Sequence, residues 1–376
     1  MKPSQPWTRH ALMIPILVVL LSWNWKWADA AFSTNLPVIA VRSQKESTPR
    51  GSRMTRHAVA SPTQLPPSSF SREFYDYDGW KLTYRYKAAE KGFEKDSPIL
   101  LIHPVGIGLS SWFWEPFMDS WKGPAVYAVD LIGCGIAEGG DAWDPDERGL
   151  SFPLGWAKGC EALLRQKILP ARGKQFSSPF LSRGKISQRC TVVAQGGLAT
   201  VGVVLAARNP DTVDRLVLTS PPTWKDMTTA IPEAELERNY NFLRSPILGN
   251  LAFNFLESRW ALEFFCNAFL FADKCDDLWI DRVLEEACKA ARPPVQAFNS
   301  GFCNHRSFEE ELRSLSQPTL LLQGSEDTTR KNKRDEYVSE MRDAMVQTIP
   351  GLNVLPWESA TDVCKAILKF QPRDRK

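Results

Sequence analysis

The sequence predicts an α/β protein, a mostly parallel, doubly wound sheet into which a block of helices is inserted. Short apolar runs alternate with helical stretches, as in "SPILLIHP" (Ser97 to Pro104) and "CTVVAQGG" (Cys190 to Gly197). Such runs are typical of parallel strands that are buried on both faces. Between Thr223 and about Ser316 the sequence changes to helices rich in Leu, Phe and Trp without strand candidates, which indicates the inserted block.

The size and composition of the chain are compatible with this fold. The chain has 376 residues and a hydrophobic fraction of 43%, which is ordinary for a globular protein. Its formal net charge of +3 is small, so we expect no nucleic-acid partner. Its eight cysteines lack C-x-x-C or Cys/His spacing. We therefore expect buried free thiols in a reducing compartment, and neither a metal site nor a cofactor.

Residues 1–31 have the features of a targeting signal. Lys2 and Arg9 precede the apolar run "ALMIPILVVLL" (Ala11 to Leu21), and "ADAAF" offers a cleavage site of small residues. The apolar run is too short to span a bilayer. We predict a cleaved signal peptide and no stable membrane span after processing, with an uncleaved anchor as the alternative.

Residues 32–70 have the composition of a transit peptide. The segment is rich in Ser, Thr, Arg and Pro, and Glu46 is its one acidic residue. Such a segment cannot bury a core. Together with Phe32 just after the cleavage site, it resembles the bipartite presequences of algae whose plastids derive from a red alga. We predict a plastid protein, and the alternative is a secreted protein with a disordered tail.

The strands are predicted in the following order. "FYDYDGWKLTYRYK" alternates apolar and polar residues around Asp78-Gly79, which indicates a hairpin. The buried strands follow in "SPILLIHP", "PAVYAVDLIG", "CTVVAQGG", "DRLVLTSPP" and "QPTLLLQGSED". The predicted division is 71–222 for the first part of the core, 223–316 for a helical cap, and 317–376 for the second part of the core. The basic insertion at 169–188 is interpreted as a solvated loop or as a docking surface.

Four motifs, in the right order, resemble the α/β-hydrolase superfamily of the AB hydrolase-1 type with a helical cap. "LLIHPVGIGLSSWFW" is similar to the strand and oxyanion loop, with His103-Pro104 in place of His-Gly. "VDLIGCGIAE" is similar to the Asp-x-x-Gly-x-Gly turn, and "ARNPDTVDRLVL" to the helix end and strand after the nucleophile. "PTLLLQGSED" is similar to the strand and loop that deliver the catalytic acid, which places Asp327 there. The resemblance covers nearly all of the chain after residue 70 and implies the α/β-hydrolase fold.

The chain departs from the family at the nucleophile. The family carries a serine in a G-x-S-x-G turn, about fourteen residues before the proline of "ARNP". Counting back from Pro210 puts Gly196 at that position, between Gln195 and Gly197. None of these three residues has a nucleophilic side chain.

The general base is also missing. Two of the four histidines lie in the presequence, one on the oxyanion loop and one late in the cap: His10, His57, His103 and His305. Alignment on Glu358 puts Asn353 at the position of the family's base, and alignment on Pro350 and Gly351 puts Val354 there. Neither side chain takes up a proton at neutral pH.

The resemblance implies that the oxyanion site is retained. The loop through His103 and Gly106 would present the Val105 N–H opposite that of Gly197, and the helix dipole would add to this site for a carbonyl or an anion. Other roles stay open. Asp327 is a reused catalytic acid or a capping residue. Gln195 binds a ligand or satisfies backbone groups. Asn353 orients Asp327 or a ligand, or is a turn residue.

Aromatic residues gather after the oxyanion loop and in the cap, where they pack in the core or line a cleft for a large apolar ligand. They are Trp112, Phe113, Trp114, Phe117, Trp121, Phe253, Phe255, Trp260, Phe264, Phe265, Phe269 and Phe271. We predict a plastid protein that binds a lipophilic small molecule between core and cap, as the gibberellin receptors use this fold without a complete triad. The alternatives are an unconventional hydrolase or lyase that works through the oxyanion site and Asp327, and a scaffold of a plastid complex.

Overall fold

The computed structural model describes residues 70–171, 189–328, 330 and 333–371. The predicted signal peptide and transit peptide, apart from Phe70, and most of the predicted basic insertion lie outside the described residues.

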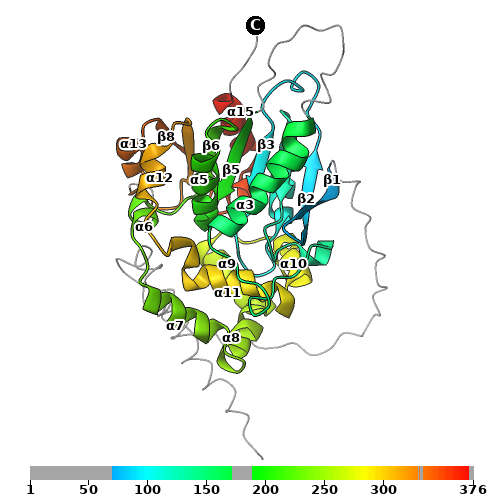
Figure 1. Cartoon of the computed structure of the whole chain (residues 1–376), viewed down its shortest axis with the longest axis vertical. Helices are drawn as coiled ribbons and strands as arrows, with labels where there is room; N and C mark the ends of the chain where they lie inside the picture. The colour runs from blue at the N-terminus through cyan, green and yellow to red at the C-terminus, as the bar shows by residue number, and fades with distance from the viewer. Residues whose placement is uncertain (1–69, 172–188, 329, 331–332, 372–376) are drawn as a thin grey trace, which may run out of the picture. The chain divides into compact units, whose positions relative to one another are not determined.

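The core is an eight-stranded sheet in the order β1-β2-β4-β3-β5-β6-β7-β8 (Figure 1). The strands are β1 (Ser71–Tyr77), β2 (Trp80–Lys87), β3 (Ile99–Ile102), β4 (Val126–Val129), β5 (Cys190–Gln195), β6 (Val213–Thr219), β7 (Thr319–Gly324) and β8 (Ala344–Ile349). The pairs β1–β2 and β2–β4 are antiparallel, and all other neighbours are parallel. The predicted mostly parallel sheet is therefore confirmed.

The hairpin between β1 and β2 follows from its turn residues. Asp78 and Gly79 both adopt positive φ angles, 50° and 75°. A two-residue turn in which both residues are left-handed matches the twist of the adjacent strands, and the Asp-Gly dipeptide readily adopts it. The hairpin predicted around this dipeptide is confirmed.

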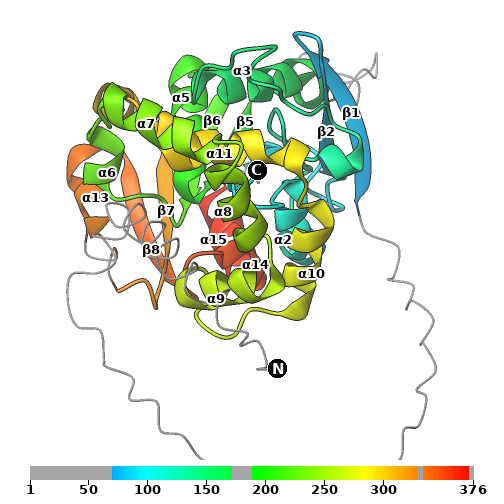
Figure 2. The ribbon, with the colours of Figure 1, turned by 90° about the horizontal axis from the view of Figure 1, so that it is seen from below.

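Helices cover both faces of the sheet, as Figure 2 shows. On one face lie α3 (Leu154–Leu163) and its extension η3 (Leu164–Ile168), together with α5 (Ala199–Arg208). On the other lie η1 (Ser111–Trp114), α2 (Glu115–Ser120), α14 (Leu355–Glu358) and α15 (Ala360–Phe370). The short elements η2 (Ile136–Glu138) and α13 (Glu336–Glu340) complete the core. All residues of β3, β4, β5 and β7 are buried, as expected for strands covered on both faces.

A block of helices lies between β6 and β7 in the chain. It contains α6 (Trp224–Thr228), α7 (Glu233–Leu243), α8 (Leu248–Leu256), α9 (Arg259–Phe269), α10 (Asp277–Glu286), η5 (Lys289–Ala291), α11 (Arg292–Ser300), η6 (Phe302–Asn304) and α12 (Glu309–Ser314). The first of these helices starts at a capping box, in which Thr223 and Asp226 exchange side-chain to backbone hydrogen bonds. Figures 1 and 2 show α7 to α11 at one end of the sheet, and we call these five helices the cap. In the described part of the chain, no helix has the length and apolar character needed to cross a bilayer.

The aromatic residues divide between the core and the cap surface. Those after the oxyanion loop, from Trp112 to Trp121, are fully buried and pack on the sheet and on one another. In the cap, Phe253 and Phe271 are buried, whereas Trp260 and Phe264 are exposed on its outer surface. For the group after the oxyanion loop, core packing is thus the correct interpretation.

Candidate oxyanion and ligand-binding site

The site is built on the turn that joins β5 to α5. Gly196 opens the short helix η4 (Gly196–Leu198) with a φ of +60°. This is the left-handed conformation that residues with side chains rarely adopt, and a strained strand-to-helix turn of this kind holds the serine in a nucleophile elbow. The structure therefore places Gly196 in an elbow that has its backbone geometry but no side chain.

The two glycines of the elbow have different surroundings. Among the described residues, a Cβ atom built on Gly196 would meet nothing within 4 Å. A Cβ atom on Gly197 would lie 2.5 Å from Cζ of Phe298, a ring of α11. The space above Gly196 is therefore open, and the cap reaches the elbow through Phe298. This contact also shows that the cap covers the carboxyl end of β5.

His103 holds the start of the oxyanion loop. Its ring is fully buried, Nδ1–H donates to the Pro104 carbonyl at 2.7 Å, and Nε2 accepts from the Leu131 N–H at 3.2 Å. Because a carbonyl can only accept and an N–H can only donate, these partners fix the proton on Nδ1. Burial lowers the pKa of His103, which favours this neutral ring. One ring nitrogen thus bonds to the oxyanion loop, and the other bonds to the segment after β4.

The oxyanion loop runs close to the cap. At Gly108, where φ is +63°, an added Cβ atom would lie 2.2 Å from the Val283 carbonyl oxygen of α10, and at Gly106 it would lie 2.9 Å from Leu109. In the described part of the chain, no turn or loop hydrogen bond takes up the Val105 N–H. Gly197 is the second residue of η4, so its N–H has no helical acceptor. Neither predicted oxyanion donor therefore has a backbone acceptor among the described turns and loops.

Gln195, at the end of β5, bonds to the end of β6 and to the loop after β8. Its Nε2 donates to the Asn353 carbonyl at 2.9 Å, and its Oε1 accepts from the Thr219 hydroxyl at 2.6 Å. The N–H of Asn353 donates in turn to the Leu270 carbonyl of the cap. The structure thus brings Gln195 and Asn353 together, with the Gln195 amide bonded to protein groups.

Asp327 lies after β7, where the family delivers its acid. It is buried, and its Oδ2 lies 2.9 Å from Nη1 of Arg334. Arg334 is also buried, and its Nε donates to the Pro221 carbonyl at 2.8 Å. Burial lowers the pKa of Arg334, and the Asp327 carboxylate opposes that shift. The sequence interpretation missed Arg334, because nothing distinguishes it from the other basic residues of "TTRKNKRDE".

Three other residues with possible nucleophilic side chains lie just after the oxyanion loop or just after β4. Ser110, Ser111 and Cys134 are all buried. Ser111 Oγ accepts a hydrogen bond from Arg85. Burial, followed by the charge of Asp130, raises the pKa of the Cys134 thiol, so the nucleophilic thiolate is disfavoured. All three lie outside the turn between β5 and α5.

A buried ionic cluster, which was not predicted from the sequence, connects the sheet to the cap. The Arg85 guanidinium contacts Glu138 and lies 3.0 Å from Glu115. Arg282 of α10 lies 3.3 Å from Glu115 and 3.8 Å from Glu138. Burial and the charge of Glu138 raise the pKa of nearby Glu286 to about 7. Within the described residues, no group of His, Cys, Asp and Glu is arranged to hold a metal ion.

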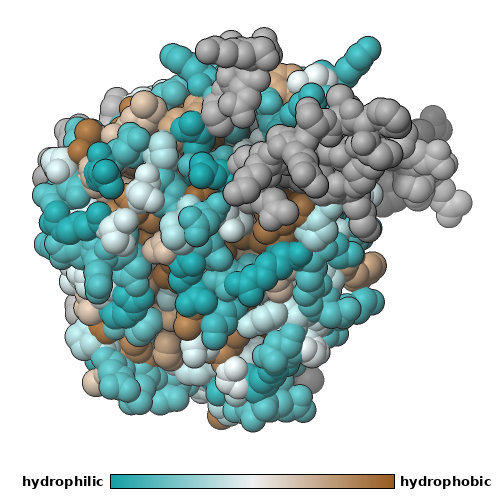
Figure 3. Space-filling model, turned by 45° about the horizontal axis from the view of Figure 1, so that its top comes forward, coloured by the Kyte–Doolittle hydropathy of each residue, from teal (hydrophilic) through white to brown (hydrophobic). Residues whose placement is uncertain are grey.

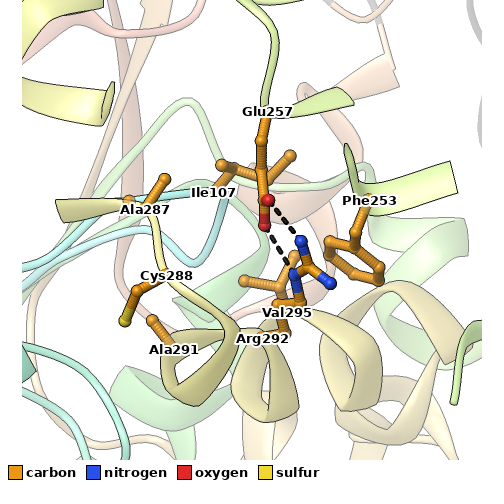
Figure 4. A pocket seen from close by; sticks show the side chains of 9 residues that line it. Ile107, Phe253, Glu257, Ala287, Cys288, Ala291, Arg292 and Val295 are labelled. Atoms are coloured by element: carbon orange, nitrogen blue, oxygen red, sulfur yellow. Dashed lines mark hydrogen bonds and ion pairs between the residues drawn. The ribbon is translucent and has the colours of Figure 1, made fainter. Parts of the chain in front are cut away.

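A small hollow lies where the oxyanion loop meets the cap (Figure 4). The empty space there is about 170 Å³ when open solvent is included, and the hollow is lined by Ile107, Gly108, Phe253, Glu257, Ala287, Cys288, Ala291, Arg292 and Val295. Glu257 and Arg292 form an ion pair along one wall, with Nε and Oε1 2.7 Å apart. The space within it that a water-sized molecule can occupy is about 10 Å³, far below the ~300 Å³ at which small-molecule pockets usually begin.

Comparison with known proteins agrees with this architecture. The family model described as "Alpha/beta hydrolase family" matches residues 99–366. Among solved structures, Cfl2 from Burkholderia cenocepacia has a TM-score of 0.59 and 17% identity, covering 81% of this chain and 96% of that one. A serine hydrolase involved in carbazole degradation has a TM-score of 0.57 and 17% identity, covering 80% and 98%. Haloalkane dehalogenase DbeA from Bradyrhizobium elkani has a TM-score of 0.56 and 16% identity, covering 80% and 97%. No curated protein matches the chain.

Proposed function

The chain belongs to the alpha/beta hydrolase family, and we propose that within this family it binds a lipophilic small molecule between core and cap without hydrolysing it. The observation that carries the proposal is Gly196. It keeps the left-handed turn of the elbow and has open space above it, but it offers no atom that attacks a substrate.

The other two triad positions support binding over covalent hydrolysis. Asn353 and Val354, at the position of the base, have no side chain that accepts a proton at neutral pH. The carboxylate of Asp327 pairs with Arg334. In serine proteases, an oxyanion site without a triad accelerates hydrolysis only about 10³- to 10⁴-fold over the uncatalysed reaction in water. Such an acceleration is small for a dedicated hydrolase.

The retained groups suggest the chemistry of the ligand. The N–H groups of Val105 and Gly197, together with the amino end of α5, favour a carbonyl or carboxylate oxygen. The Phe298 ring beside Gly197 offers an apolar contact next to these donors. We therefore propose a ligand with one oxygen-bearing head and an apolar body, such as an acyl lipid or an isoprenoid. The plastid location stays a proposal that rests on the composition of residues 1–70.

A fluorophosphonate probe tests the absence of a nucleophile. The probe reacts with activated serines, and we expect no labelling of the protein under conditions that fully label a serine hydrolase of the same fold. Peptide mass spectrometry after the reaction detects any adduct. An adduct on a serine of this chain would show that another residue has replaced Gly196 as nucleophile, and would overturn the proposal.

Ligand retention tests the binding site itself. The protein is incubated with a plastid lipid and pigment extract, reisolated, and examined by native mass spectrometry for retained small molecules. Gly196→Asn would fill the open space with a residue that tolerates the left-handed conformation, so we expect retention to fall. Gly196→Ala adds one methyl group and serves as the control. Equal retention by Gly196→Asn and the unchanged protein would contradict a site at the elbow.

A further inference from the structure

Exposed apolar side chains concentrate on the cap. Of the nine large apolar side chains that are exposed in the described chain, six lie on or directly before α8, α9 and α10: Ile247, Leu248, Leu251, Trp260, Phe264 and Leu278. Figure 3, with the end opposite the cap turned forward, shows a mainly hydrophilic surface on which apolar residues are scattered. An apolar surface confined to one region marks an interaction site.

On α9 these side chains form a ridge of aromatic rings. Trp260 and Phe264 stack with ring centres 5.9 Å apart and an angle of 16° between their planes, and Phe265 and Phe269 stack at 6.1 Å and 23°. Phe264 and Phe265 link the two pairs at 5.3 Å. The stacked pairs are spaced i and i+4, so each pair shares one side of the helix. Trp260 is 59% exposed, which places this part of the ridge in solvent.

The neighbouring helix α8 extends the ridge. Leu248, Leu251 and Phe255 recur at the spacing of one helical face, and Phe255 contacts Trp260 with ring centres 5.9 Å apart. The two helices therefore present one continuous apolar surface. Figure 1 shows α8 at the lower end of the described ribbon, away from the sheet, and Leu248 and Leu251 on it are exposed.

The charges beside the ridge restrict its partner. Arg259 contacts Asp281 and lies 3.7 Å from Glu263 and 3.9 Å from Asp277. One cation thus faces three carboxylates, and the excess negative charge repels an anionic surface. An uncharged or zwitterionic surface carries no such penalty.

We infer that the cap docks on an electroneutral lipid bilayer through the apolar ridge of α8 and α9. Trp and Phe are favoured at the boundary between headgroups and acyl chains, and amphipathic helices lie in that plane without spanning the membrane. A projecting ridge enters a bilayer without the matching groove that a protein partner would have to supply. The inference concerns the outer face of the cap and is independent of the ligand proposed for the elbow.

A site-specific fluorescent label tests the inference in the full chain. Cys288 is the exposed cysteine and the other seven are buried, so Cys288→Ser gives a background for labelling. An environment-sensitive dye is attached in this background at Leu251→Cys. Met345→Cys on β8 is the matched control, because Leu251 and Met345 are 51% and 52% exposed.

We expect phosphatidylcholine vesicles to shift the emission of the Leu251→Cys label to the blue and to leave the Met345→Cys label unchanged. Vesicles enriched in phosphatidylserine should give a weaker response. Since both labels are carried by the full chain, binding through residues 1–31 alone would leave the Leu251→Cys label unshifted and would overturn the inference.

Removing the ridge provides the second measurement. Trp260→Ser with Phe264→Ser, in the Leu251→Cys background, should raise the lipid concentration at half-maximal response by about tenfold or more, because two large apolar side chains no longer leave water. An unchanged response would contradict the inference. A blue shift that depends on protein concentration without vesicles would identify a second copy of the chain as the partner, and would also overturn it.

Discussion

Gly196 and Gly197 are adjacent but are constrained by different forces. At Gly196 the backbone favours glycine, because a φ of +60° is costly for most residues with a Cβ atom, whereas the surrounding space would accept one. At Gly197 the limit is the Phe298 ring of the cap. The elbow therefore keeps its left-handed conformation, which glycine adopts without strain, although no serine needs to be lifted toward a substrate.

Replacing Gly196 with serine should leave the protein folded and inactive. We expect Gly196→Ser to lower the free energy of unfolding by about 1 to 2 kcal/mol, because the left-handed conformation costs this much for a side-chain-bearing residue. Ester hydrolysis should stay at background, since Asn353 cannot take the proton from the new hydroxyl. Urea denaturation and turnover of a chromogenic ester measure the two effects. Efficient hydrolysis by this variant would show that a base is present after all.

The raised pKa of Glu286 makes stability depend on pH. Its pKa rises from 4.5 to about 7, caused by burial first and then by Glu138 and Asp130, while Arg282 and Arg85 oppose the shift. Because the folded state disfavours the ionised carboxylate, Glu286 contributes a loss of stability as pH rises from about 4.5 to about 7.

Glu286→Gln removes this dependence. The variant should match the wild type near pH 4.5 and exceed its free energy of unfolding by about 1 to 3 kcal/mol at pH 8, where the lower value allows for solvent screening. Urea denaturation across this pH range measures the difference. Glu285→Gln, at an exposed neighbour, is the control. A difference that is constant with pH would contradict the assignment.

At the scale of elements, local signals predicted the sheet and failed for contacts between distant residues. Apolar runs and the Asp78-Gly79 turn were sufficient for the strands, because burial and turn conformation depend on nearby residues. Gly196 was located by its spacing from a downstream proline. The Asp327–Arg334 pair and the cluster around Arg85 were not predicted, since their partners meet only when the sheet and cap have formed.

Trp279 anchors α10 of the cap to the core. Its ring packs edge-on against Trp112, Phe113, Phe271 and Trp357, with ring centres between 5.0 and 6.0 Å apart. Trp279→Ala should therefore lower the free energy of unfolding by about 3 to 5 kcal/mol.

Trp260→Ala is the matched control, since it removes the same side chain from the cap surface. It should change stability by about 0.5 kcal/mol or less. Guanidinium denaturation of both variants provides the comparison. Equal losses would mean that the ridge of α9 supports the fold, and a small loss for Trp279→Ala would mean that α10 is held by other contacts.

At the scale of the whole molecule, cap and core share one hydrophobic cluster. Buried strand residues, including Ile99, Leu101 and Val193, belong to the same cluster as Leu262 of α9 and Ile280 of α10. Glu115 of α2 and Glu138 of η2 each contact both Arg85 of β2 and Arg282 of α10, which adds a charged link between sheet and cap. Removing the cap would expose both the apolar cluster and a buried guanidinium, so separation of cap and core is costly.

This shared core predicts that cap and core unfold together. In urea, tryptophan fluorescence and far-UV circular dichroism should give coincident transitions, because Trp279 of the cap and the strands beneath it lose their packing in one step. Trp279→Ala removes the central contact, and should shift the fluorescence transition to lower urea by more than the dichroism transition. Two separate transitions in the unchanged protein, with the cap melting first, would contradict a shared core. They would also point to a cap that opens easily, in which case ligand entry at Gly196 would need no disruption of the sheet.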